Sequence, residues 1–282
     1  MMSSTALPRS PREAKALLAA ALAATAVFAS LPAVAQATDS WRFQGAVNLY
    51  LPTIGGTTAF PILPAGSGDA AVDADMIVDN LKMAFMGSFE ASKGSFGLFT
   101  DVLYMDIGNT KSGFREISIG GLPIPAGASA KAEYDLKGWG WTLGGTWRAV
   151  TDPAATLDVL AGARLLDIEQ TLTWDITGNV GSIPAPGRAG TSKVQLNNWD
   201  GIVGVKGRLA LSADRKWFAP YYVDVGAGES KLTWQALGGV GYAFQWGDVV
   251  ASWRYIDYQM KSGSAIQSLT FNGPQVSAVF RW

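Results

Sequence analysis

The chain ends in a stretch that alternates residue by residue, Gly273-Pro274-Gln275-Val276-Ser277-Ala278-Val279-Phe280-Arg281-Trp282. Successive side chains of a strand point to opposite faces, so every second residue shares a face. One face here is apolar and aromatic: Val276, Ala278, Phe280 and Trp282. The other face is mainly polar: Gln275, Ser277, Val279 and Arg281. The stretch therefore predicts a strand that is apolar outside and polar inside, as in a transmembrane β-barrel.

The same alternation recurs along the chain and predicts about ten strands, with eight and twelve as alternatives. The expected strands are 41–52, 79–92, 95–108, 131–149, 156–173, 196–212, 217–229, 231–246, 248–260 and 268–282. Both phases of the segment 95–108 carry large apolar groups, so its faces stay open. The predicted fold is an all-β, antiparallel, up-and-down transmembrane barrel.

The connections between these strands alternate in length. Short ones lie near 92–95, 151–154, 212–216 and 247–248, and long ones lie near 53–78, 109–130 and 174–195. Short turns inside and longer loops outside are the rule for outer-membrane barrels, which predicts periplasmic N- and C-termini.

The tryptophans support this arrangement, because indole is favoured at a membrane–water boundary. One set falls at the predicted periplasmic strand ends: Trp41, Trp147, Trp217, Trp246 and Trp282. A second set falls at the predicted outer ends: Trp139, Trp141, Trp174, Trp199 and Trp234. Trp253 alone lies well inside a strand.

The N-terminus is typical of a secretory signal. Basic residues Arg9, Arg12 and Lys15 precede an apolar run over 16–32 and the small-residue site Ala33-Val34-Ala35. We expect a signal peptide at 1–35, with cleavage after Ala35 or Ala37, and a barrel domain at 36–282. An uncleaved anchor is the alternative. No later stretch reaches the ~20 apolar residues that a spanning helix needs.

Composition excludes several classes of function. Charged residues are 16% of the 282-residue chain, where about 25% is usual for a soluble protein. The formal net charge is −1, which gives no indication of nucleic-acid binding. The chain has no Cys, so disulfides are excluded, and no His, the usual general base near neutral pH. We expect no cofactor, no metal and no catalytic residues.

The chain resembles the small outer-membrane β-barrel proteins of Gram-negative bacteria in its expected signal peptide, its alternating strands and its aromatic last strand. The resemblance implies an outer-membrane location, contact with membrane lipid and lipopolysaccharide, and recognition of the last strand by the outer-membrane assembly machinery. The residues of that assembly signal would be Val276, Ala278, Phe280 and Trp282. The known enzymes on such barrels, among them phospholipases, lipid A deacylases and acyltransferases, and omptin-like proteases, resemble one another in using a His base, which this chain lacks.

Charged residues on the inward phase predict a layer inside the barrel. The charges of this phase are Lys82, Glu90, Asp101, Arg148, Asp158, Arg164, Asp200, Lys206, Arg208, Asp224, Arg254 and Arg281. Strand counting places four of them at mid-depth: Asp101, Arg164, Asp224 and Arg254. Two interpretations stay open, an ion-pair network that fills the lumen and a selectivity zone of a narrow channel.

The three long loops share paired prolines with apolar neighbours and a following Gly. The prolines are Pro61, Pro64, Pro123, Pro125, Pro184 and Pro186. They predict stiffened loops, or apolar tips that form a cap over the outer mouth or one adhesive patch.

Three functions follow in order of preference. The first is a non-catalytic outer-membrane protein, structural or interacting through its loops. The second is a narrow, porin-like channel for small polar or ionic solutes. The third is a loop-mediated adhesin or a carboxylate-based enzyme. The sequence identifies no solute, partner or oligomeric state.

Overall fold

A computed structural model describes residues 40–61, 69–73, 81–110, 118–119, 122–123, 128–180 and 183–282. It describes side chains at 40–60, 85–107, 133–173 and 189–282. The predicted signal peptide, 1–35, lies outside these ranges. Among the described residues, no helix is long and apolar enough to cross a membrane.

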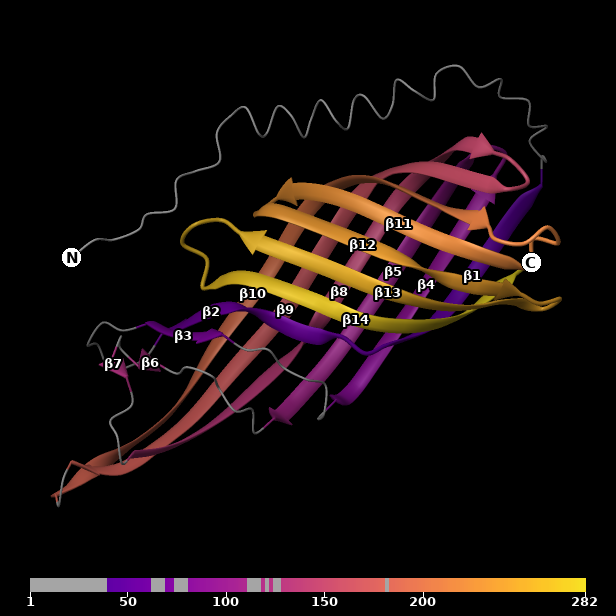
Figure 1. Cartoon of the computed structure of the whole chain (residues 1–282). Coiled ribbons are helices and arrows are strands. Elements are labelled where there is room, and N and C mark those ends of the chain that lie inside the picture. Colours follow the sequence, from indigo (N-terminus) through magenta and orange to yellow (C-terminus); the bar gives the residue numbers. More distant parts are fainter. Residues whose placement is uncertain are drawn as a thin grey trace, which may run out of the picture. The chain divides into compact units, whose positions relative to one another are not determined.

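Ten antiparallel strands form a closed barrel (Figure 1). The strands in barrel order are β1 (Trp41–Tyr50), β4 (Leu81–Lys93), β5 (Phe96–Thr110), β8 (Ala128–Thr151), β9 (Ala155–Val180), β10 (Ile183–Ala210), β11 (Trp217–Gly228), β12 (Ser230–Ala243), β13 (Gly247–Met260) and β14 (Ile266–Arg281). Pairing of β1 with β14, from Gln44 opposite Arg281 to Tyr50 opposite Gln275, closes the barrel. The predicted number of strands and their antiparallel order are confirmed.

Four shorter strands occupy segments that the sequence assigns to loops: β2 (Thr53–Pro61), β3 (Asp69–Asp73), β6 (Ser118–Ile119) and β7 (Leu122–Pro123). β2 follows β1 and pairs with the outer part of β14, from Thr53 opposite Asn272 to Thr58 opposite Ile266. β3 pairs with the other edge of β2. β6 and β7 form a hairpin of their own. The barrel wall is therefore extended by local pairing beyond the ten strands.

Strands β8, β9 and β10 are much longer than expected, and Figure 1 shows their ends extending past the other strands. The prediction of a loop over 174–195 is wrong, because β9 and β10 stay paired as far as Val180 and Ile183. Backbone pairing between adjacent antiparallel strands does not require the apolar alternation that predicts a lipid-facing strand. The Thr-, Gly- and Pro-containing segment thus continues the ladder without the sequence pattern of a membrane strand.

The outer surface between the two ends of the barrel is apolar. Large side chains exposed there include Val47, Leu49, Phe85, Leu98, Leu143, Val203, Val223, Val240 and Val276. The faces left open for the segment 95–108 are resolved, since Phe96 and Leu98 point outward whereas Phe99, Leu103 and Met105 are buried inside. An apolar belt on a closed barrel is the surface that lipid covers.

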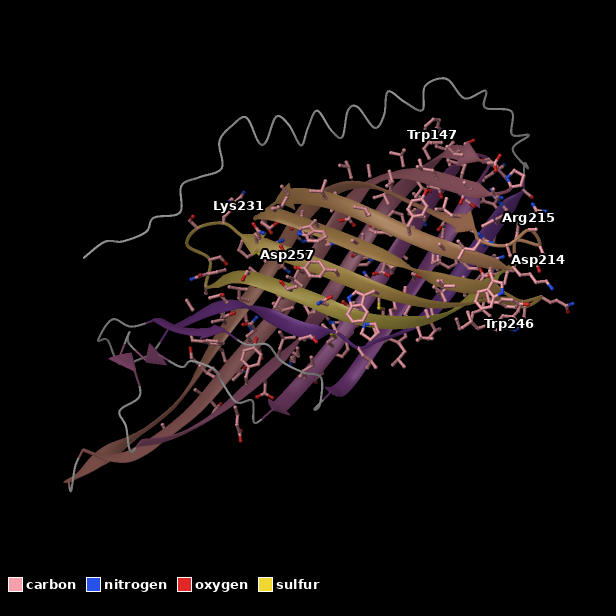
Figure 2. The ribbon with its side chains drawn as sticks, in the orientation of Figure 1. Trp147, Asp214, Arg215, Lys231, Trp246 and Asp257 are labelled. Atoms are coloured by element: carbon pink, nitrogen blue, oxygen red, sulfur yellow. The ribbon has the colours of Figure 1, made fainter. Side chains whose placement is uncertain are left out.

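Two groups of tryptophans border this belt. The group beside the short turns is Trp41, Trp147, Trp217, Trp246 and Trp282, all exposed. Figure 2 shows Trp147 and Trp246 at the end of the barrel that carries the turn residues Asp214 and Arg215. At the other border, Trp141 and Trp199 contact each other edge to face, with ring centroids 6.3 Å apart. The side chain of Trp174 lies outside the described side chains.

The outer surface changes character just beyond the second tryptophan group. Trp139 is paired with Asp167, which accepts a hydrogen bond from Asn197 at 3.0 Å. One step further, Glu169 accepts hydrogen bonds from Lys193 at 3.3 Å and from Gln195 at 2.8 Å. This polar exterior places the extended parts of β8–β10 outside the apolar belt.

The interior becomes apolar at the end where the exterior becomes polar. The expectation of a polar lumen is wrong for this part of the barrel. The half of the barrel away from the short turns, called the outer half below, encloses an apolar cluster of nineteen buried side chains. Strands β2, β5, β8, β9, β13 and β14 contribute to it. Leu136, Ile168 and Phe271, for example, are each exposed by less than 4%. Beyond the belt the barrel therefore has apolar side chains inside and polar side chains outside, as water-soluble barrels do.

Candidate functional site

The four charges predicted at mid-depth lie together in the lumen as two ion pairs. Arg254 Nη2 donates to Asp101 Oδ1 at 2.7 Å, and Arg164 pairs with Asp224. Gln235 Oε1 accepts from both guanidinium groups, at 3.1 Å from Arg254 and 3.2 Å from Arg164. The five side chains form one polar layer across the lumen, which we call the charge layer.

Four side chains of the charge layer are buried, and that of Asp101 is 21% exposed. The side chains of Arg164 and Asp224 are exposed by 2% and 0%. Arg164 also donates to Thr142 Oγ1 and Thr233 Oγ1, both at 3.3 Å. Ions held in such a place must be paired and hydrogen-bonded, because desolvation costs several kcal/mol per ion. The two acids of the layer balance its two arginines, while Asp224 Oδ1 and Arg254 Nε have no hydrogen-bond partner among the described residues.

Above the charge layer the lumen is filled. The space between the layer and the apolar cluster measures about 20 Å³, room for roughly one water molecule. Further out, the rings of Phe60 and Tyr134 meet edge to face at 6.3 Å, from β2 and β8 respectively. Tyr50 is 3% exposed and donates to the carbonyl of Arg254 at 3.3 Å. The described side chains thus leave no wide passage through the outer half.

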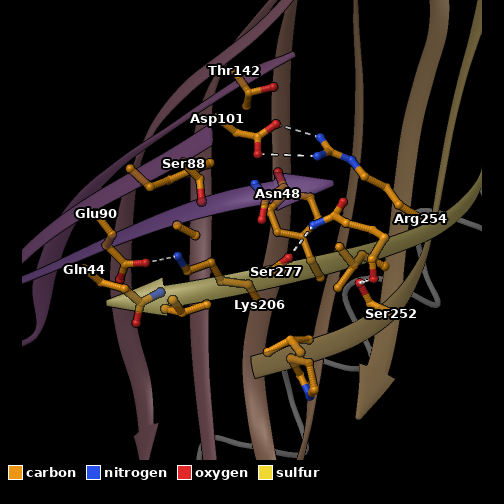
Figure 3. A pocket seen from close by; sticks show the side chains of 18 of the residues that line it. Gln44, Asn48, Ser88, Glu90, Asp101, Thr142, Lys206, Ser252, Arg254 and Ser277 are labelled. Atoms are coloured by element: carbon orange, nitrogen blue, oxygen red, sulfur yellow. Dashed lines mark hydrogen bonds and ion pairs between the residues drawn. The ribbon is translucent and has the colours of Figure 1, made fainter. Parts of the chain in front are cut away.

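Below the charge layer, toward the short turns, lies a chamber of about 200 Å³ (Figure 3). Its polar lining comes mainly from β1, β4, β13 and β14: Gln44, Asn48, Ser88, Glu90, Ser252, Gln275 and Ser277. Its apolar lining includes Phe99 and Tyr222, whose rings meet edge to face at 6.4 Å. Asp101 and Arg254 of the charge layer lie at one end of the chamber, as Figure 3 shows.

A further ion pair joins two sides of the chamber, between Glu90 of β4 and Lys206 of β10. Lys206 Nζ also lies 5.1 Å from the centroid of the Phe99 ring. Figure 3 shows Glu90 and Lys206 facing each other across the pocket, away from Arg254. Every charged side chain that lines the chamber therefore has an opposite charge as its partner.

The mouth at the short-turn end carries further pairs. Arg148 Nη2 donates to Asp158 Oδ2 at 3.1 Å, and Arg281 pairs with Asp248. Arg208 lies over the ring of Phe218, 4.0 Å from its centroid. Phe218 in turn occupies the space beside Gly241, where a Cβ atom would lie 2.4 Å from the ring. Glycine at 241 is thus required for Phe218 to lie across the lumen.

The remaining predicted residues are placed as follows. Val276, Phe280 and Trp282 point outward, and Trp282 stacks against Phe43 with ring centroids 6.2 Å apart. Ala278 shares their phase and is opposite Val47 of β1. The inward-phase charges with described side chains face the lumen. Lys82 lies outside the described side chains.

The prolines of the proposed cap are described only in part. Pro61 and Pro123 end β2 and β7, and Pro184 and Pro186 lie in β10. Pro64 and Pro125 lie outside the described residues. β3 and β6 are in contact, so the first two loop segments approach each other through these strands. The cap itself stays a prediction.

The sequence missed the chamber and the apolar cluster. Phase alone identified the inward charges, but it could not show that Gln235 joins the two arginines, because that contact links three different strands. Among the described residues, no three Asp, Glu, His or Cys side chains are arranged to hold a metal ion.

A closed antiparallel barrel with an apolar belt, two tryptophan borders and a charged interior is an outer-membrane-type β-barrel. The sequence matches no protein-family model and no curated protein.

The chain is similar in fold to several solved outer-membrane barrels. The outer membrane protease OmpT of Escherichia coli is 8% identical, with a TM-score of 0.45 over 89% of this chain and 99% of its own. The translocator domain of the Neisseria meningitidis autotransporter NalP is 19% identical, with a TM-score of 0.36 over 96% and 98%. The Pseudomonas putida toluene transporter TodX is 12% identical, with a TM-score of 0.28 over 91% and 92%. These likenesses concern the fold alone.

Proposed function

We propose that this protein is a non-catalytic, non-conducting barrel of the bacterial outer membrane that acts as a structural or surface-interacting protein. The observation that carries the proposal is the filled lumen. An apolar cluster occupies its outer half, and only about 20 Å³ is free between that cluster and the charge layer. A hydrated ion would have to shed its water against apolar side chains to pass.

The absence of catalysis is supported by the chemistry of the lumen. The chain has no His and no Cys, so a Ser or Thr hydroxyl has no ordinary activating base. The carboxylates nearest the chamber, Asp101 and Glu90, are bound to Arg254 and Lys206. A carboxylate held by a cation is a weak general base, which disfavours the carboxylate-pair enzyme.

The surface of the barrel supports the proposed location and orientation. The apolar belt fits membrane lipid, and the polar exterior of β8–β10 beyond the belt fits the lipopolysaccharide and water outside the cell. In this orientation the short turns and the C-terminus are periplasmic. The exposed Phe280 and Trp282 at the end of β14 are then available to the outer-membrane assembly machinery.

A planar-bilayer recording tests the proposal. We expect the purified barrel to insert and give no steady conductance, whereas a porin added to the same bilayer gives ion-conducting steps. Insertion is verified by protease protection of the belt in vesicles of the same lipid. A steady current from the inserted barrel that shifts when Arg254 is replaced by Gln would overturn the proposal and favour the narrow channel, because that current would pass through the charge layer.

A further inference from the structure

The chamber on the short-turn side of the charge layer has the properties of a binding site that the proposed function does not use. It is closed on one side by the charge layer and the apolar cluster, so a molecule that enters it cannot cross the barrel. It reaches Gln44, which is paired with Arg281, and the Arg281 side chain is 42% exposed. The chamber is therefore one layer of side chains away from solvent at that end.

Several polar side chains in the chamber have no protein partner. Gln44, Asn48 and Ser88 make no side-chain hydrogen bond to any described residue, and all three line the chamber (Figure 3). The Oε1 atom of Gln275 is buried and also lacks a partner among the described residues, although its Nε2 donates to Ser277 at 3.0 Å. A buried acceptor without a partner is destabilising, so it favours any occupant that can donate a hydrogen bond to it.

The charges of the chamber argue against an ionic occupant. Glu90 is paired with Lys206, and Asp101 is paired with Arg254. An anion or cation entering the chamber would have to break one of these pairs or remain unpaired in a desolvated site. The free groups are amides and hydroxyls, which both donate and accept hydrogen bonds to neutral molecules.

The apolar part of the chamber lining argues against a purely polar occupant. Phe99 and Tyr222 present aromatic surface to the chamber, and Val250 and Val279 add aliphatic surface. An occupant that carries both hydroxyl and C–H groups would match this mixed lining. The volume of about 200 Å³ equals roughly six or seven waters at ~30 Å³ each, which is the size of a single sugar ring.

We infer that this chamber binds a neutral polyhydroxylated molecule of monosaccharide size from the short-turn side of the barrel. Gln44, Asn48, Ser88 and Gln275 hydrogen-bond its hydroxyl groups, and Phe99 and Tyr222 contact its C–H face. The charge layer ends the chamber, so the barrel retains the molecule and does not transport it.

Equilibrium dialysis of the folded full barrel tests the inference. The barrel is kept in an amine-oxide detergent, since a glycoside detergent would compete for the chamber. The probes are radiolabelled D-glucose, D-galactose, D-mannose and myo-inositol. We expect at least one of them to bind saturably at one site per barrel, with a Kd of roughly millimolar order or tighter.

Two variants connect such binding to the chamber. Ser88→Phe fills the space and should abolish binding. Asn48→Leu replaces the amide by an apolar group with the same heavy-atom branching and should weaken binding roughly fivefold to tenfold. Val47→Leu changes the adjacent residue, which is 60% exposed on the lipid face, and should leave binding unchanged. Tryptophan fluorescence verifies that each variant is folded before dialysis.

Three results would overturn the inference. The first is no saturable binding of any of the four probes up to roughly 100 mM, far above a millimolar Kd. The second is binding that persists in folded Ser88→Phe. The third is tighter binding of D-glucuronate or D-glucosamine than of every neutral probe. None of these results depends on whether the barrel conducts, so the inference and the proposed function can fail separately.

Discussion

Replacing Arg164 with Met should destabilise the barrel far more than the same change at Lys193. Arg164 is 2% exposed, and its removal leaves the fully buried Asp224 without its cation. Breaking a buried pair in this way costs about 3–5 kcal/mol. Lys193 pairs with Glu169 on the outer surface, where their side chains are 61% and 25% exposed, and such pairs contribute about 0–1 kcal/mol. Methionine keeps most of the side-chain length in both variants, so the comparison sets the loss of a buried guanidinium and its hydrogen bonds against the loss of an exposed ammonium.

Urea unfolding in lipid vesicles, followed by tryptophan fluorescence, measures both free energies of unfolding. A loss of about 3 kcal/mol lowers the folding equilibrium constant more than a hundredfold. The double variant Arg164→Met with Asp224→Leu should regain most of the loss, because no unpaired charge remains. A loss below about 1 kcal/mol for Arg164→Met, or a double variant that loses the sum of its two single changes, would refute the reasoning.

Three further outcomes are expected. Val203→Arg places a cation in the apolar belt and should cost about 2–4 kcal/mol by urea unfolding, whereas Gln195→Arg beyond the belt should cost nearly nothing. Leu136→Ala in the apolar cluster should cost about 2–5 kcal/mol in the same assay, and a smaller loss would show a loosely packed cluster. In the turn before β11, a hydrogen bond from the Ser212 hydroxyl holds the pKa of Asp214 below its ordinary value. The turn therefore gains stability above the ordinary carboxyl pKa and loses it as the pH falls through the lowered one. Ser212→Ala should raise the Asp214 pKa in an NMR titration, and an unchanged pKa would contradict this.

The faces of the barrel could be predicted because the period of a strand is two and a charge in lipid is costly. Slipping β10 by one residue would expose Lys206 and Arg208 to lipid, so its phase is determined by sequence alone. The charge layer could be predicted by the same argument. Once the phase of a strand is known, counting residues from its end gives the depth of each inward side chain in the barrel. The structure places Asp101 and Arg254, and Arg164 and Asp224, in contact at that depth.

The apolar cluster could not be predicted because its residues share the composition of the lipid face. In the segment 95–108, Leu98 faces outward whereas Leu103 and Met105 face inward, and hydropathy does not distinguish them. The chamber was also missed, since it is enclosed by strands that come together only when the barrel closes. The pairing of β2 with β14 depends on the path of the chain after Tyr50, and no periodic pattern encodes that path.

The seam between β1 and β14 joins the two ends of the barrel sequence. Asn48 and Ser277 are partners there, and the backbone groups of Phe43 and Trp282 exchange two hydrogen bonds, at 2.9 and 3.1 Å. The wall therefore cannot close before β14 has been synthesised. Until then both edge strands expose unpaired amides and carbonyls, which invites aggregation. A barrel of this topology therefore stays prone to aggregation until β14 pairs with β1, because only that pairing removes both free strand edges.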